Sequence, residues 1–268
     1  MRNPLSDKVV QMKPSGIRKF FDLVQEMPDA ISLGVGEPDF DTPWHIREEG
    51  IYSLEKGRTF YTSNAGLLEL RKAIAHYMYR KYELTYGQDH CSIASLPGMR
   101  DRTIIINGFS KSFAMTGWRM GFATGPELIM QQILKIHQFA IMAAPTTSQY
   151  AAIEAMTNGE EDVQIMRNAY NQRRRFVLEL FSEMGLKCFE PEGAFYMFPC
   201  IKEFGMTSDE FANRFLREEK VAIIPGTAFG DCGEGFLRVS YAYSIEELKE
   251  ALGRLANFVE RLRKEKNL

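Results

Sequence analysis

The chain has 268 residues, of which 45% are hydrophobic and 25% charged, and its formal net charge is −2 at pH 7. This composition is typical of a globular protein with one large or two small domains, and the balanced charge argues against nucleic acid or a membrane surface as a partner. The four cysteines stand singly and the four histidines lack metal-ligand spacing, so we expect no disulfide framework, no metal site and a cytoplasmic location.

Residues 1–30 are predicted to form an arm with one amphipathic helix over 17–25. A short strand over 30–33 then leads into the loop 34–40, Gly-Val-Gly-Glu-Pro-Asp-Phe. The loop is no dinucleotide fingerprint, because an aspartate stands where the third glycine is required. Gly36 would let the backbone approach a ligand closely, and a plain tight turn is the alternative.

The segment after residue 40 contains a helix start and, further on, a tyrosine before a second helix. Thr42 followed by Pro43 predicts a helix with Thr42 as its N-cap and Pro43 at its first position. Further on, Tyr61 precedes Thr-Ser-Asn-Ala-Gly and a helix that extends to about residue 81. A lone tyrosine before a helix is more often a packing residue than a chemical one, so Tyr61 gains interest only from its neighbours.

The stretch 107–121 carries the strongest signal for chemistry. It follows Thr-Ile-Ile-Ile, an apolar β-branched run that predicts a strand over 103–108, and it precedes a second predicted strand over 120–124. Lys111 stands just past the first strand between two serines, and Arg119 follows eight residues later. The neighbouring aromatic residues predict an apolar setting, which favours the neutral amine that Schiff-base chemistry requires.

The remainder is predicted to form helices and a final α+β unit. The expected helices cover 126–139, 147–156, 161–184 and 208–219, and the expected strands cover 187–189, 194–199, 221–225 and 235–240. The helix over 126–139 has a predicted apolar face. Ser244 and Glu247 form a capping-box pattern that starts a last helix, whose predicted apolar stripe comprises Leu248, Leu252, Leu255, Val259 and Leu262. Arg238 lies within an apolar strand, where a guanidinium is costly unless it meets an anion, either a ligand or a structural ion-pair partner.

Taken together, these motifs resemble the pyridoxal-phosphate (PLP) dependent aminotransferases of fold type I, class I/II, which include aspartate and aromatic aminotransferases. The resemblance implies that Lys111 forms the Schiff base with pyridoxal 5'-phosphate and acts as general base. It also implies that Arg119 and Ser110 bind the cofactor phosphate, and that Tyr61 reaches the phosphate of the partner subunit in a homodimer.

The same resemblance implies a substrate site for amino acids and 2-oxo acids. Arg238 would hold the substrate α-carboxylate, and Gly36 would line the substrate pocket. Five aromatic residues near these motifs favour aromatic or other apolar substrates: Phe109, Trp118, Phe195, Tyr196 and Phe229.

One part of the family pattern is missing. The resemblance covers two blocks, 1 to about 87 and about 90 to 268, and the central block of the large domain has no counterpart, including its glycine-rich loop and the aspartate that pairs with the cofactor ring. We therefore expect an α/β, PLP-dependent transferase-like fold with an incomplete large-domain sheet and a smaller α+β domain. The expected parts are an N-terminal arm with part of the small domain over 1–40, a truncated large domain over 41–145 and the small domain over 146–268.

Three hypotheses follow for the function. The first is an aminotransferase, impaired by the missing block. The second is a catalytically inactive remnant that acts as a binding or dimerisation module. The third is another PLP enzyme with the same lysine motif, such as a C–S lyase.

Overall fold

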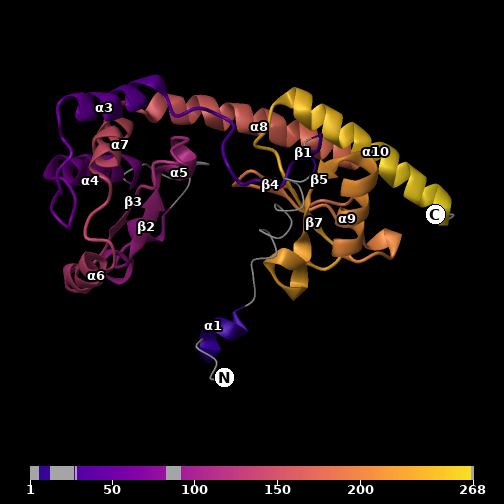
Figure 1. Cartoon of the computed structure of the whole chain (residues 1–268), viewed down its shortest axis with the longest axis horizontal. Coiled ribbons are helices and arrows are strands. Elements are labelled where there is room, and N and C mark those ends of the chain that lie inside the picture. Colours follow the sequence, from indigo (N-terminus) through magenta and orange to yellow (C-terminus); the bar gives the residue numbers. More distant parts are fainter. Residues whose placement is uncertain (1–5, 13–26, 28, 83–91, 267–268) are drawn as a thin grey trace, which may run out of the picture. The chain divides into compact units, whose positions relative to one another are not determined.

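The structure is a computed structural model that describes residues 6–12, 27, 29–82 and 92–266 (Figure 1). The chain divides into two compact units: unit 1 comprises residues 1–36 and 169–268, and unit 2 comprises residues 37–168. The division into parts that the sequence predicts, at residues 40 and 145, stays a prediction. The helix predicted over 17–25 lies outside the described residues.

Unit 2 contains an antiparallel pair of strands together with helices. Its elements in chain order are α3 (Trp44–Glu55), α4 (Leu68–Tyr82), the 3-10 turns η1 (Ile93–Ser95) and η2 (Arg100–Arg102), β2 (Ile105–Gly108), α5 (Phe109–Ser112), β3 (Gly121–Thr124), α6 (Glu127–Ala140) and α7 (Thr146–Asn158). The strand pairs run from Ile105 opposite Thr124 to Gly108 opposite Gly121. The two strands predicted beside the lysine are thus confirmed, and within the described part of unit 2 they form a two-stranded sheet.

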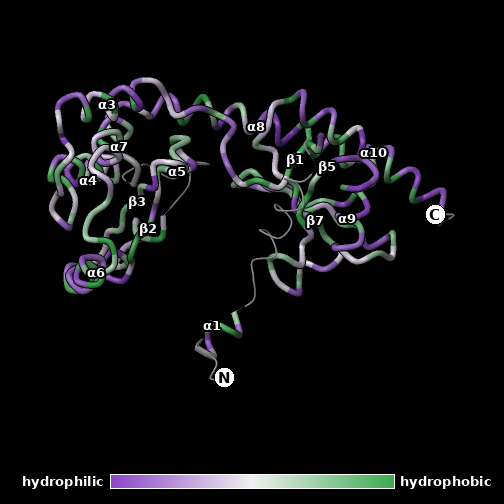
Figure 2. Tube along the Cα trace, viewed as in Figure 1, coloured by the Kyte–Doolittle hydropathy of each residue, from purple (hydrophilic) through white to green (hydrophobic). Residues whose placement is uncertain are grey.

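The core of unit 2 lies between the helices and one side of this pair. Its buried residues come from α3, α4, α7 and the segment around α5: Ile46, Leu70, Phe109, Phe113, Met115, Met120, Ala151, Ala152, Ala155 and Met156. The other side is open. Ile106 in β2 is 82% exposed, although β2 begins with two isoleucines. Figure 2 shows hydrophobic positions in green along the elements of unit 2. α6 buries none of its residues, so the apolar face predicted for this helix is not covered.

An open groove of about 1340 Å³ lies along the strand pair of unit 2 and reaches the core residues Leu70 and Met120. Apolar side chains from α4, β3 and α6 line it, including Ile74, Phe122 and Leu134. Such an exposed apolar surface normally receives another protein element. A two-stranded sheet is also only marginally stable without further strands or packed helices, so unit 2 has the character of a partial domain.

Unit 1 contains the rest of the described elements. They are α1 (Asp7–Gln11), β1 (Ile31–Ser32), β4 (Tyr196–Met197), the 3-10 turn η3 (Lys202–Phe204), α9 (Ser208–Glu219), β5 (Val221–Ala222), β6 (Ile224–Pro225), the 3-10 turns η4 (Gly226–Phe229) and η5 (Asp231–Gly233), β7 (Leu237–Ser240) and α10 (Ile245–Lys266). The long helix α8 (Glu160–Glu183) begins in unit 2 and ends in unit 1.

The strands of unit 1 form two small sheets. β1 pairs in parallel with β5, and β7 lies between β4 and β6 with both partners antiparallel to it. The predicted strand over 221–225 is therefore divided at Ile223 into β5 and β6. The predicted strand over 187–189 is reduced to a single bridge between Cys188 and Pro199.

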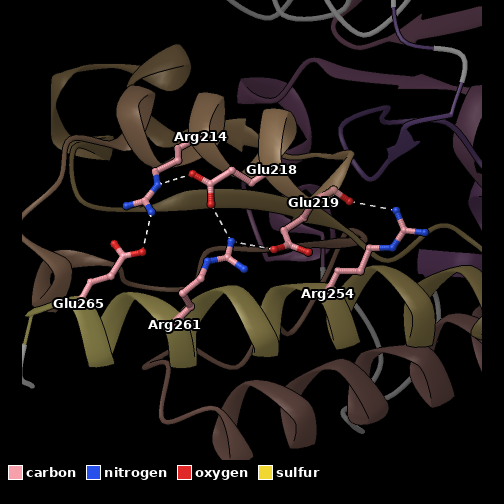
Figure 3. Close-up of polar contacts among 6 residues, drawn as sticks. All are labelled: Arg214, Glu218, Glu219, Arg254, Arg261 and Glu265. Carbon is pink, nitrogen blue, oxygen red and sulfur yellow. Dashed lines mark hydrogen bonds and ion pairs between the residues drawn. The ribbon is translucent and has the colours of Figure 1, made fainter.

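Helices α9 and α10 bury the sheets of unit 1. Their starts agree with the sequence, since Ser244 and Glu247 exchange the two hydrogen bonds of a capping box before α10. The predicted apolar stripe of α10 is buried throughout: Leu248, Leu252, Leu255, Val259 and Leu262. On the polar side of the two helices, arginine and glutamate side chains form the network that Figure 3 shows, made of Arg214, Glu218, Glu219, Arg254, Arg261 and Glu265.

One predicted helix start is wrong. The sequence places Thr42 at the N-cap of the following helix, but α3 begins at Trp44 with Pro43 at the N-cap, and no side chain caps it. The Thr42 hydroxyl instead donates to the Ala114 carbonyl at 2.6 Å and accepts from the Trp118 indole N–H at 3.1 Å. A long-range pair of hydrogen bonds therefore outcompetes the local cap and ties this residue to the loop after Lys111.

Candidate active site

Lys111 lies on an exposed turn that buried aromatic residues anchor. It occupies the last turn of α5, directly after β2, and its side chain is exposed. Phe109 is fully buried and Phe113 is 2% exposed, and their rings lie 5.8 Å apart. The aromatic residues near the lysine thus form the core beneath the turn, and the predicted apolar setting of the amine is not what the structure shows.

The loop from Ala114 to Arg119 is held in a strained conformation. Both residues have positive φ angles, 50° and 53°, in the left-handed region that residues other than glycine avoid. Such strain persists only where the surroundings fix the backbone, and it concentrates at functional sites. Here Thr42 binds the carbonyl of Ala114, and the Ser148 hydroxyl donates to the Trp118 carbonyl at 2.8 Å.

Arg119 presents its guanidinium on the same exposed loop. Its Nη1 donates to the Thr116 carbonyl at 2.9 Å, and the side chain is otherwise exposed. Ser110 lies one residue before Lys111 in α5. The loop therefore carries an amine, a guanidinium and a hydroxyl within ten residues, which is the donor chemistry that a phosphorylated aldehyde requires. These residues fit the aldehyde and phosphate ends of PLP.

Trp118 also explains a glycine inside a helix. Gly50 in the middle of α3 costs about 1 kcal/mol relative to alanine by helix propensity. A Cβ built at Gly50 would lie 2.7 Å from the Trp118 ring. The glycine thus lets the indole pack closely on α3, and α3 supports the loop that carries Arg119.

Tyr61 stands on a separate loop of unit 2. Its side chain is 84% exposed, and that of the neighbouring Phe60 is 80% exposed. The loop itself is fixed, because Thr146 donates to the Phe60 carbonyl at 2.7 Å and the buried Gln149 donates to the Thr62 hydroxyl at 2.8 Å. Two exposed aromatic side chains on an anchored loop leave the Tyr61 hydroxyl accessible from outside the unit.

Gln149 is the positioning residue that sequence reasoning missed. It is fully buried in α7, accepts from the Leu67 N–H at 2.8 Å and donates to the Ala144 carbonyl at 2.9 Å. Its partners lie up to 87 positions away along the chain. No local pattern reveals a glutamine of this kind.

Arg238, the residue predicted to bind the substrate carboxylate, lies in unit 1. It lies in β7 and is only 9% exposed. Its Nη2 donates to the Gly34 carbonyl at 2.6 Å, while its buried Nε has no hydrogen-bond partner. Burial lowers the pKa of the guanidinium. Among the described residues no carboxylate pairs with Arg238, so a structural ion pair does not account for it.

Gly36 lies against an aromatic side chain of the same unit. A Cβ built at Gly36 would lie 1.8 Å from the hydroxyl oxygen of Tyr196. The Tyr196 ring in turn lies 4.3 Å from the Arg238 guanidinium carbon, and the Phe229 ring lies 4.5 Å from it. Gly36, Tyr196 and Arg238 therefore form one cluster. Phe195 is a core residue with 7% exposure.

The predicted site residues thus fall into two groups, in two units. Ser110, Lys111 and Arg119 share one loop of unit 2, with Tyr61 on another loop of that unit, and Gly36 and Arg238 belong to the cluster of unit 1. The first group has the chemistry to hold a cofactor with a phosphate and an aldehyde. The second has the chemistry to hold a carboxylate.

Comparison with known proteins identifies the family. The pattern of the aminotransferase class I and II family matches residues 28–99 and 83–255. A putative aminotransferase of Bacillus subtilis, YugH, is 38% identical, covering 97% of this chain and 99% of the relative. An aspartate aminotransferase of Pyrococcus abyssi is 32% identical, covering 98% and 99%. The crystal structure of a Pyrococcus protein called A1 superposes with a TM-score of 0.88 at 32% identity, covering 97% and 99%.

The chain therefore belongs to the class I and II aminotransferases, with their fold type I architecture, and it is an enzyme of the amino-group-transfer class. Members of this family use PLP. The alignment with YugH extends over 382 positions, more than the 268 residues of this chain, so the relative carries a segment that this chain lacks. The two family matches overlap at residues 83–99, which include the position where the sequence predicts the missing block. No described helix has the length and apolar character needed to span a membrane.

Proposed function

We propose that this chain carries PLP on Lys111 and transfers an amino group from an amino acid to a 2-oxo acid. The observation that carries the proposal is the loop of unit 2, where Lys111 lies on an exposed turn and Arg119 lies on the strained backbone that follows. Strain at this loop costs stability, and a binding role for the loop gives a reason for that cost.

Lys111 has two tasks in this proposal. Its Nζ would hold the cofactor covalently, and, once freed by the substrate amine, the same Nζ would act as general base that takes the substrate Cα proton and passes it to the cofactor rather than back to Cα. The bound cofactor supplies an electron sink for the carbanion that loss of this proton leaves. The exposed position of Lys111 on α5 leaves room for both tasks.

Arg119 and Ser110 would hold the cofactor phosphate. A phosphate carries about two negative charges at neutral pH, and a planar guanidinium matches its oxygens with two parallel hydrogen bonds. The Arg119 side chain uses Nη1 for the Thr116 carbonyl, which orients the guanidinium on the loop. Tyr61, on its anchored and exposed loop, would reach the phosphate of the partner subunit, and this role requires a homodimer.

The substrate site would lie in unit 1. Arg238 offers donors to the α-carboxylate that amino acids and 2-oxo acids share, and Gly36 brings the backbone close to the bound substrate. The cluster contains two aromatic rings, those of Tyr196 and Phe229. These rings favour aromatic or other apolar substrates over dicarboxylic ones. We place the reaction in the cytoplasm, in line with the single spacing of the four cysteines in the sequence.

Borohydride reduction tests the cofactor site. The chain incubated with PLP and reduced with borohydride should gain one cofactor mass, and peptide mapping should place it on Lys111. Lys111→Ala should lose the label, and Arg119→Lys should keep the label while retaining less cofactor after dialysis. A label on another lysine would exclude this site, and absence of any label would favour the hypothesis of an inactive remnant. Release of a thiol and a 2-oxo acid from cysteine derivatives would instead favour the C–S lyase.

A further inference from the structure

Two aromatic side chains pack against the guanidinium of Arg238. The Tyr196 ring lies 4.3 Å from the guanidinium carbon and comes from β4, and the Phe229 ring lies 4.5 Å from it and comes from η4. An arginine over an aromatic ring gains electrostatic attraction, and the gain grows when water is excluded. Arg238 is 9% exposed, so both contacts are largely shielded from water.

The hydrogen bonds of Arg238 leave donors for a ligand. Nη2 is used by the Gly34 carbonyl at 2.6 Å, which fixes one corner of the guanidinium. The buried Nε has no partner within the described part of the protein, and a buried donor without a partner is destabilising. The hydrogen bond to Gly34 thus orients the guanidinium before a carboxylate ligand binds.

Tyr196 is itself held in place. Its ring lies 4.9 Å from the buried Phe195 ring, and its hydroxyl lies over Gly36, where only a glycine leaves space. Burial raises the pKa of the Tyr196 hydroxyl, opposed by the charge of Arg238, so the phenol is neutral at neutral pH. The contact with Arg238 is thus made by the ring and not by a phenolate charge.

We propose that Tyr196 and Phe229 are positioning residues that hold the plane of the Arg238 guanidinium for a carboxylate ligand. Neither residue needs to touch the reacting atoms. Each ring restricts rotation of the guanidinium about its long side chain, so that less orientational freedom is lost when the carboxylate binds. The proposal rests on the carboxylate-binding role of Arg238 in the proposed function.

Binding of a simple carboxylate to the full chain tests the proposal. The probe is 3-phenylpropionate, measured by isothermal titration calorimetry, with the neutral 3-phenylpropionamide as its matched ligand. Tyr196→Leu should raise the dissociation constant of the carboxylate about tenfold, since cation–π contacts in shielded sites have this order of magnitude. Tyr196→Phe keeps the ring and should bind within about threefold of the unaltered chain. Phe229→Leu supplies a second variant that spares the core, because Phe229 is 41% exposed.

The role through Arg238 has its own signature. In an Arg238→Gln background, Tyr196→Leu should no longer change carboxylate binding, and amide binding should be the same in all variants. Equal carboxylate binding by the unaltered chain, Tyr196→Leu and Phe229→Leu would overturn the positioning role while Arg238→Gln still weakens binding. Failure of Arg238→Gln to weaken binding, or no binding by the unaltered chain, would overturn the carboxylate role of Arg238 and the positioning role with it.

Discussion

Strands β7 and β2 show how the same kind of sequence has two different outcomes in this chain. Every residue of β7, including its arginine, is buried between two strands and two helices of unit 1. In β2 the two central residues are exposed, and Ile106 reaches 82%. Each of the two strands carries two apolar aliphatic side chains among its four residues. The difference lies in the covering elements, which unit 1 contains and the described part of unit 2 does not.

This difference has an energetic meaning. Full burial of an isoleucine side chain contributes about 1.5–3 kcal/mol, and a strand that stays exposed forgoes this contribution. In unit 1, burial of the apolar side chains of β5, β6 and β7 provides this stabilisation. Unit 2 holds its lysine loop with a smaller core and with hydrogen bonds from Thr42 and Ser148. The alignment with YugH is longer than this chain, so that relative carries a segment that this chain lacks.

A matched pair of isoleucine substitutions gives the largest expected effect. Ile224→Ala in β6 removes a fully buried side chain and should lower the free energy of unfolding by about 2–5 kcal/mol. Ile106→Ala in β2 removes the same atoms from an exposed site and should change it by less than about 0.5 kcal/mol. Urea unfolding followed by far-UV circular dichroism measures both. Equal losses would mean that β2 is covered in solution, contrary to the comparison.

The contact between Gly36 and Tyr196 gives the next largest effect. Gly36→Ala places a methyl group on the Tyr196 hydroxyl and should destabilise unit 1 by about 1–3 kcal/mol, the usual cost of overpacking. Tyr196→Phe removes the hydroxyl, so the double variant should regain most of the loss. The measurement is a double-mutant cycle of the unfolding free energy. Additive effects of the two substitutions would show that the hydroxyl does not meet the new methyl group.

His45 gives unit 2 a contact that depends on pH near neutrality. Its Nδ1 lies 2.7 Å from Glu154 and its Nε2 lies 2.9 Å from Asp162, and only the protonated ring donates to both carboxylates. Burial lowers the pKa of His45, but the hydrogen bonds and charges of Asp162 and Glu154 outweigh it and leave the pKa raised above 6.5. The stabilisation is therefore complete below about pH 6.5, the pKa in the unfolded chain, and is lost as the pH rises through the raised pKa.

The expected change is at most about 1 kcal/mol, because the His45 side chain is 35% exposed and water screens the contact. Tryptophan fluorescence during urea unfolding reports on unit 2 alone, since the two tryptophans of the chain, Trp44 and Trp118, both lie there. The midpoint should fall between about pH 6 and about pH 9, and His45→Gln should flatten that dependence. A midpoint of the unaltered chain that rises over this interval would contradict the assignment.

The sequence correctly predicts those structural features that depend on residues close together in the chain. The capping box at Ser244, the stripe of α10 and the strands on either side of Lys111 all follow from residues within a few positions of one another, and the structure agrees with each. Thr42 was predicted wrongly because its partners, Ala114 and Trp118, lie more than 70 positions away. Local patterns contain no information about such partners.

Some features of the candidate site follow from local sequence, and others depend on the folded chain. The spacing from Lys111 to Arg119 is a local motif, and the sequence alone singles it out. Its exposed setting could not be predicted, because the aromatic residues that suggest an apolar pocket turn inward to form the core. The packing of Tyr196 and Phe229 on Arg238 joins three separate elements, so it appears only in the folded chain.

The network between α9 and α10, which Figure 3 shows, should give the smallest effect, although several ion pairs join its residues. Glu218 accepts from Arg214 at 2.6 Å and from Arg261 at 2.6 Å, and the hydrogen bond from Arg214 is the main cause of its lowered pKa. The lowered pKa means that its contribution is present above the pKa of the unfolded chain and is lost as the pH falls through the folded value.

Glu218→Gln should nevertheless cost less than about 1 kcal/mol at neutral pH, because the ion pairs lie at the surface, where water screens the charges and long side chains lose freedom. The loss should shrink between about 0.1 and 1 M salt, as the Debye length falls from about 10 to 3 Å. Glu179→Gln on α8 is the control, since Glu179 is exposed and has no ion pair among the described residues. A salt-independent loss of several kcal/mol would instead place Glu218 in the core of unit 1, and the stability of that unit would then depend on its charges as much as on its buried strands.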